Sequence, residues 1–287
     1  MTISDTRPAS GTAFQSAATR LLDVGGTAFA YRELGPPTGV PLVMLNHWGA
    51  VLDNFDPRIV DGLASRHRVI AIDYRGIGRS GGTAPLTVAE MAQDTIALIR
   101  AMGVGRVDLL GFSLGGFVAQ QVVLDAPDLV RRLILTGTGP AGGRGIDRVG
   151  RVSGPLIAKG LLTRRDPKYY LFFTASARGR QAANDFLHRL KERTSDRDRP
   201  ASPGAFLRQL KAITAWGRQA PRDLSGIRIP VLIANGDSDI MVPTPNSADL
   251  AHRIPNATLV IYDDAGHGGI FQYHAEFVAE ALAFLSS

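Results

Sequence analysis

The sequence contains no cysteine among its 287 residues. This absence excludes thiol nucleophiles, thiolate zinc sites, iron–sulfur clusters and disulfide bonds. Long apolar runs are missing too, because no stretch approaches the roughly 20 residues of a membrane-spanning helix. Residues 1–18 are small and polar and lack the apolar core of a signal peptide. We therefore expect a flexible N-terminal arm over 1–18, a cytoplasmic protein and no membrane partner.

Charge is spread unevenly along the chain. The net charge of +6 would suit a nucleic-acid partner. Residues 142–222, however, hold 18 Lys and Arg against 6 Asp and Glu, a balance of +12, and the remainder carries −6. This segment has no run of five basic residues and no nucleic-acid-binding motif, and its charges alternate with apolar residues as on amphipathic helices. The pattern predicts an acidic body with a solvated basic insert and no nucleic-acid partner.

Short apolar runs alternate with helical patterns, as in a parallel α/β sheet that is buried on both faces. The expected strands are 41–45, 68–74, 107–112, 133–136, 229–234 and 258–262, and the expected helices are 87–102, 114–125, 245–253 and 275–285. An antiparallel hairpin is expected at the sheet edge, over 20–24 and 27–33.

The alternation of strands and helices is interrupted once. It stops near Gly142 and resumes at 229, which indicates one sheet domain with an insertion. We therefore assign 19–141 and 223–287 to an α/β core and 142–222 to a helical lid.

A nucleophile motif follows one of these strands. Gly111-Phe112-Ser113-Leu114-Gly115 is a G-x-S-x-G sequence between a buried strand and a helix. Glycines two residues before and after the serine permit a sharp turn that lifts the Ser113 hydroxyl above the sheet. The Leu114 N–H begins the following helix, where positive partial charge stabilises an oxyanion.

Serine needs a base, and the base needs an orienting group. His267 lies on a glycine-flanked loop after the last strand, at the sheet edge where α/β proteins place their chemistry. Asp237 and Asp239 both follow the penultimate strand at that same edge. The chain order serine, acid, histidine is typical of one arrangement of this triad.

These features resemble the α/β-hydrolase superfamily, and within it the lidded, cofactor-free esterases, lactonases and haloperoxidase-like enzymes. The stretch Asp73–Ser80 matches the family pattern D-x-R-G-x-G-x-S, and Gly236–Pro243 matches G-x-x-D-x-x-V-P. The resemblance covers nearly the whole chain from about Arg20. It implies a mostly parallel sheet with helices on both faces, an inserted helical lid, and neither a metal nor another cofactor.

The resemblance also implies a role for individual residues of the site. It selects Asp239 as the acid of a triad with Ser113 and His267, and leaves Asp237 as a neighbour that shapes the loop. The family usually ends its third strand with His-Gly-x, whereas this chain has Asn46-His47-Trp48. The second oxyanion donor is then the Trp48 N–H, beside that of Leu114, and His47 appears near the mouth of the site.

Aromatic residues concentrate in the insert, at Tyr169, Tyr170, Phe172, Phe173, Phe206 and Trp216. They favour a closed apolar pocket, with His47, Trp48, Phe172, Phe173 and Trp216 as candidate substrate contacts. The expected activity is hydrolysis of a small or medium apolar ester or lactone. Perhydrolase or haloperoxidase-like chemistry, carbon–carbon bond hydrolysis and a triad-retaining ligand sensor stay open. The oligomeric state stays open too, a homodimer included.

Overall fold

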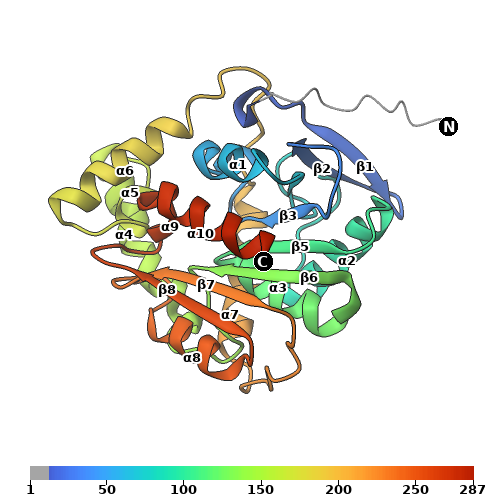
Figure 1. Ribbon diagram of the computed structural model, residues 1–287. Helices are drawn as coiled ribbons and strands as arrows, with labels where there is room; N and C mark the ends of the chain where they lie inside the picture. The colour runs from blue at the N-terminus through green and yellow to red at the C-terminus, as the bar shows by residue number, and fades with distance from the viewer. Residues whose placement is uncertain (1–12) are drawn as a thin grey trace.

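The computed structural model describes residues 13–287, and this part of the chain forms an eight-stranded sheet in the order β1-β2-β4-β3-β5-β6-β7-β8 (Figure 1). The β1–β2 hairpin is antiparallel and β2 pairs antiparallel with β4, whereas the other neighbours are parallel. The strands are β1 Arg20–Val24, β2 Thr27–Leu34, β3 Leu42–Leu45, β4 Val69–Ile72, β5 Val107–Phe112, β6 Val130–Thr136, β7 Val231–Gly236 and β8 Ala257–Tyr262.

Helices cover both faces of the sheet. On one face α1 contacts α10, and on the other α2 contacts α3, which packs on β3, β5 and β6 (Figure 1). The core helices are α1 Pro57–Ala64, α2 Val88–Ala101, α3 Leu114–Asp125, α8 Pro245–Arg253, α9 Gly269–Gln272 and α10 His274–Ser286, with the 3-10 turns η2 Leu52–Asn54 and η3 Pro127–Leu129. Every residue of β3, β4 and β5 is buried, as a parallel strand covered on both faces requires.

Local signals in the sequence act as expected. The Thr87 Oγ1 accepts the Glu90 N–H at 3.1 Å, and the Glu90 carboxylate accepts the Thr87 N–H at 3.1 Å, so the capping box that begins α2 is complete. The fold class predicted from the sequence is confirmed by this topology.

Between β6 and β7 the chain leaves the sheet and forms a helical insert. Its elements are η4 Ile146–Arg148, α4 Val149–Thr163, α5 Lys168–Leu171, α6 Ala177–Arg189 and α7 Pro203–Gly217. Figure 1 shows α4, α5 and α6 grouped at one end of the sheet. The insert contacts the core through α6 on α9 and through α7 on α2.

Most basic residues of the insert are exposed to solvent, as expected, but several bind the acidic body instead. The Arg189 guanidinium is buried against Asp56, with Nη2 to Oδ2 at 2.6 Å, and also donates to the Phe271 carbonyl. Arg208 donates to the Ala84 carbonyl. The long arginine side chain can reach an acceptor on another element of the fold. The alternation of charged and apolar residues in the insert therefore did not reveal these partners.

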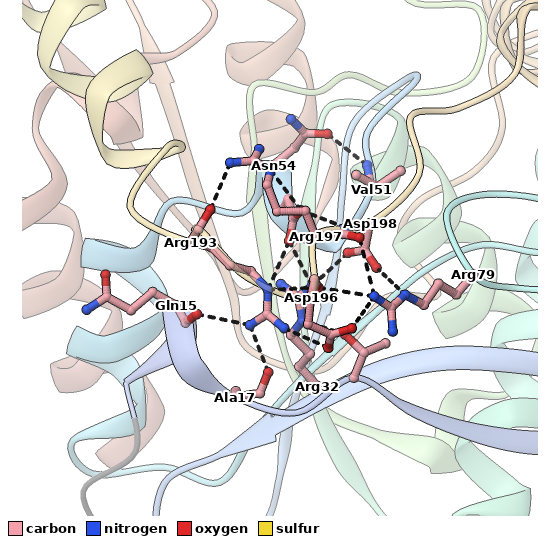
Figure 2. A network of polar contacts seen from close by, with 12 residues as sticks. Gln15, Ala17, Arg32, Val51, Asn54, Arg79, Arg193, Asp196, Arg197 and Asp198 are labelled. Carbon is pink, nitrogen blue, oxygen red and sulfur yellow. Dashed lines mark hydrogen bonds and ion pairs between the residues drawn. The ribbon is translucent and has the colours of Figure 1, made fainter.

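A network of ion pairs holds the connection from α6 to α7 (Figure 2). Its centre is Arg32 on β2, whose side chain is fully buried between Asp53 at 2.7 Å and Asp198 at 2.8 Å. The Asp198 N–H also donates to Asp53 at 2.8 Å. Arg79 reaches Asp196 and Asp198 from the loop after β4. Two acidic side chains of the basic insert thus bind arginines of the body.

Residues 1–12 of the expected arm lie outside the described residues, and the remainder of the arm packs on the core. Phe14, in the turn η1 Phe14–Ser16, is 3% exposed and meets the Phe55 ring edge-on. Arg193 of the insert donates to the carbonyls of Gln15 and Ala17, at 3.0 and 2.9 Å (Figure 2). The mostly small and polar residues of the arm led to the expectation of flexibility, although Phe14 among them is buried.

Among the helices of residues 13–287, none combines the length and the apolar character that crossing a bilayer requires.

The burial of Arg189 gives a stability prediction with a matched control. Arg189→Ala leaves the Asp56 carboxylate buried without its partner and should lower the free energy of unfolding by about 3 kcal/mol. Arg58 pairs with Glu192 across the same boundary but is 47% exposed, so Arg58→Ala should cost less than about 1 kcal/mol. Urea unfolding of both variants measures the difference, and equal losses would contradict the assignment.

Candidate active site

Ser113 lies between β5 and α3 in a strained backbone conformation. Its φ is 56° and its ψ is −116°, a region that non-glycine residues avoid at a cost of about 1–3 kcal/mol. The flanking glycines make the turn possible, because a Cβ on Gly111 would lie 2.3 Å from the Gly115 carbonyl oxygen, and one on Gly115 would lie 2.3 Å from that of Leu45. The chain therefore turns at Ser113 with α3 pressed against the end of β3.

His267 is bonded to an acid from the neighbouring loop. Its Nδ1 lies 2.8 Å from Asp239 Oδ2, and both side chains are almost fully buried. The other oxygen of Asp239 accepts the N–H groups of Met241 and Val242, at 2.8 and 3.0 Å. These bonds fix the carboxylate, so that the imidazole donates from Nδ1 and keeps Nε2 as an acceptor.

The two aspartates after β7 have separate partners. The Asp237 carboxylate accepts the N–H groups of Asp264 and Ala265, at 3.1 and 3.2 Å, and so shapes the loop that carries His267. Only Asp239 of this pair bonds the imidazole ring. The two side chains therefore have different surroundings, one within the loop backbone and one against the imidazole.

Two backbone donors lie beside Ser113 without partners. Among residues 13–287, neither the Trp48 N–H nor the Leu114 N–H has a hydrogen-bond acceptor. Leu114 opens α3, where the first N–H groups of a helix are unpaired. Trp48 lines one cavity together with Ser113, which directly precedes Leu114.

The cavity has a volume of about 240 Å³ and is lined mainly by apolar side chains. The core contributes His47, Trp48, Gly49, Ser113, Phe117, Met241, Val242 and His267, and the insert contributes Val149, Ile157, Asp166, Pro167, Lys168, Leu171, Phe172, Phe206 and Ile213. Asp166 and Lys168 form an ion pair at 3.0 Å. The predicted nucleophile and base therefore share a small, mostly apolar chamber that the insert closes.

His47 lines this chamber but is a neutral, buried ring. Its Nδ1 lies 2.9 Å from the Trp48 carbonyl oxygen, and the rings of Phe112 and Phe172 meet it edge-on. Burial, more than the nearby charge of Lys168, lowers the pKa of His47 from 6.5 to about 3. A neutral ring bonded to a carbonyl carries its proton on Nδ1, and Nε2 is left without a partner among the described residues.

Two of the expected pocket residues do not line the chamber. Trp216 is 2% exposed and stacks on Phe117 with 5.5 Å between ring centroids, so it supports the chamber from behind. Phe173 packs on Phe186 of α6. Trp48 and Phe172 do line the chamber, as His47 does. Phe172 and Phe173 are adjacent residues just after α5, yet only Phe172 lines the chamber, and the sequence did not show which of the two faces inward.

Further residues line the chamber that were not among the expected substrate contacts. Phe206 and Ile213 lie seven residues apart on one face of α7, a spacing visible in the sequence. Met241 and Val242, two and three residues after Asp239, line the chamber and donate the N–H groups that hold the carboxylate. Among residues 13–287, no group of three His, Asp or Glu side chains is placed to hold a metal ion.

Comparison with known proteins defines the family. A family model described as the alpha/beta hydrolase fold matches residues 40–272, and the chain therefore belongs to the α/β-hydrolase fold family. A solved structure, an alpha/beta hydrolase fold protein from Chitinophaga pinensis, is 38% identical with a TM-score of 0.91, over 96% of this chain and 100% of that one.

Relatives of known or assigned activity are more distant. A putative carbamate hydrolase RutD from a Caulobacter species is 31% identical over 233 residues, which are 79% of this chain and 84% of the relative. A pimeloyl-(acyl-carrier protein) methyl ester esterase from Aliivibrio salmonicida is 29% identical, over 86% of this chain and 92% of the relative. The chain thus resembles hydrolases that differ in substrate.

The pKa of His47 predicts a pH-dependent stability. Because burial lowers the pKa in the folded state to about 3, the unfolded chain binds a proton here below pH 6.5 while the folded protein does not. Stability is therefore lost as the pH falls below 6.5. His47→Gln lacks this loss, so the free energy of unfolding of the variant relative to wild type should rise by about 2 kcal/mol between pH 7.5 and pH 5.

Urea unfolding of both proteins at the two pH values measures this change. The other five histidines are present in both proteins. An unchanged difference would show that His47 is protonated in the folded state at pH 5.

Proposed function

We propose that the protein is a serine hydrolase that cleaves small to medium apolar esters or lactones through an acyl-enzyme. The observation that carries this proposal is the 2.8 Å bond between His267 Nδ1 and Asp239 Oδ2, in a chamber that also holds Ser113 on a strained turn. A serine of this kind becomes a nucleophile when a neighbouring oriented imidazole takes its proton.

Each group then has one role in the reaction. Ser113 Oγ attacks the substrate carbonyl as its proton passes to His267 Nε2, and Asp239 stabilises the resulting imidazolium. The N–H groups of Trp48 and Leu114 bind the oxyanion, and their lack of other partners supports that role. His267 then protonates the leaving alcohol and activates the water that releases the acid.

The chamber supports the proposed substrate class. A volume of about 240 Å³ suits a small acyl group, and its apolar lining favours an uncharged chain. The methyl ester esterase among the relatives acts, by its name, on an ester, and supports an ester over other acyl substrates.

Removing the nucleophile tests the proposal. Wild type should hydrolyse p-nitrophenyl acetate and butyrate faster than the dodecanoate, because a long chain does not fit the chamber. Ser113→Ala should lower turnover of the butyrate by about 10⁴-fold or more. A fluorophosphonate probe should add one adduct to wild type by intact mass and none to the variant. Undiminished hydrolysis by Ser113→Ala would refute the proposal, and labelling without turnover would favour a ligand sensor.

The two aspartates should differ in their effect on rate. Asp239→Asn removes the charge that orients and stabilises His267, and should lower kcat by about 10³- to 10⁴-fold. Asp237→Asn keeps an oxygen for one of the two loop N–H groups and does not touch the bond to the imidazole, so it should lower kcat less than about 10-fold. Steady-state kinetics on p-nitrophenyl butyrate distinguishes the variants, and a larger loss in Asp237→Asn would reverse the assignment.

A further inference from the structure

Helix α7 of the insert binds the loop that carries the proposed oxyanion donor Trp48. The Trp48 indole N–H donates to the Phe206 carbonyl at 2.8 Å, and the two rings stack with 4.0 Å between centroids. One residue later, the Gly49 N–H donates to Gln209 Oε1 at 2.8 Å. Two consecutive residues of a core loop are therefore bound by two residues one turn apart on α7.

Gln209 is unusual for a side chain inside a helical bundle. It is 0% exposed, and its Nε2 has no partner among the described residues, so half of a buried amide is unsatisfied. An unpaired buried polar group costs about 1–3 kcal/mol. An apolar residue of similar size would avoid that cost but would offer no acceptor to Gly49. The side-chain carbonyl of Gln209 therefore has a specific role, which is to accept the Gly49 N–H.

The loop lies in close contact with α7. Gly49 has φ of +71°, and a Cβ at this position would lie 2.7 Å from the Phe206 ring. A glycine here lets the backbone lie directly against the aromatic side chain. The loop conformation and the position of α7 therefore depend on each other.

The hydrogen bonds orient two successive peptide groups. The peptide between Trp48 and Gly49 is held at both ends, because its carbonyl accepts from the His47 ring at 2.9 Å and its N–H donates to Gln209. In the preceding peptide, the His47 carbonyl accepts the Ala50 N–H at 3.2 Å. The N–H of that peptide belongs to Trp48 and, being trans to this bonded carbonyl, points to the opposite side, where it has no protein partner.

We propose that Gln209 is a positioning residue for the oxyanion hole, so that the hole is complete only when α7 is seated on the core. The inference rests on the proposed function. It follows that displacement of the insert, which lines the chamber, also releases the Gly49 N–H and frees the Trp48–Gly49 peptide, the neighbour of the peptide that carries the Trp48 N–H. Closure over the substrate and assembly of the oxyanion hole are then one event.

The test replaces the acceptor and leaves its bulk. Gln209→Met should lower kcat on p-nitrophenyl butyrate by about 10- to 100-fold with KM changed less than about 3-fold, less than the loss of a donor outright. Gln209→Glu keeps an oxygen facing Gly49 and should recover most of the rate. Lys211→Met, exposed on the same helix, is the matched control and should keep the wild-type rate.

A transition-state mimic separates positioning from general damage. Affinity for a trifluoromethyl ketone, whose hydrate-like adduct bears an oxyanion, should fall in Gln209→Met by the same factor as kcat. Affinity for the parent methyl ketone should stay within about 3-fold, whereas a merely structural defect would weaken both. Gln209→Asn, whose carbonyl is one methylene short of Gly49, gives the same readout if the Met variant does not fold.

Ser113→Ala is measured in parallel. If it retains activity, the proposed function fails. If it is inactive while Gln209→Met or Gln209→Asn keeps the wild-type kcat and ketone affinities, the proposed function stands and the role of Gln209 is refuted.

Discussion

The close approach of α3 to the end of β3 is the constraint on which the site depends. Gly115 lies against the Leu45 carbonyl so tightly that no side chain fits, and Ser113 accepts a φ of 56° as a result. This packing brings the start of α3 beside the loop that leaves β3. Gly111 and Gly115 allow these backbone segments to pack in direct contact, which brings the nucleophile and the two unpaired N–H groups to the same region. The burial of the sheet offsets the backbone strain at Ser113.

The helical insert is fastened to the core by two different kinds of contact. Far from Ser113, buried guanidinium–carboxylate pairs fix the connection around Arg193 and Asp198, and breaking one leaves a desolvated charge. Where α7 meets the loop of Trp48 and Gly49, its contacts are one aromatic stack and two neutral hydrogen bonds. Neutral contacts of this kind are each worth about 1 kcal/mol, so α7 is held less firmly where it meets the active-site loop.

Local signals in the sequence predicted what local chemistry decides. The parallel strands, the capping box at Thr87, the turn at Ser113 and the separate partners of Asp237 and Asp239 all follow from short motifs. Such short motifs do not determine how distant segments pack together. Whether Trp216 or Phe206 faces the chamber depends on how α7 rotates on the core, and the buried site of Phe14 depends on Phe55, 41 positions away in sequence.

The basic character of the insert does not extend into the chamber. No arginine is among the residues that line it, and Lys168 is neutralised by Asp166. The guanidinium groups of Arg189, Arg193 and Arg208 instead donate hydrogen bonds to carboxylate and carbonyl oxygens of the body. A +12 segment over the site would attract anions if its charges faced inward. Thirteen of the 18 basic residues of the insert are instead exposed to solvent. The excess charge therefore lies outside the chamber, whose lining stays apolar, and only the few arginines that bind the body help to seat the insert.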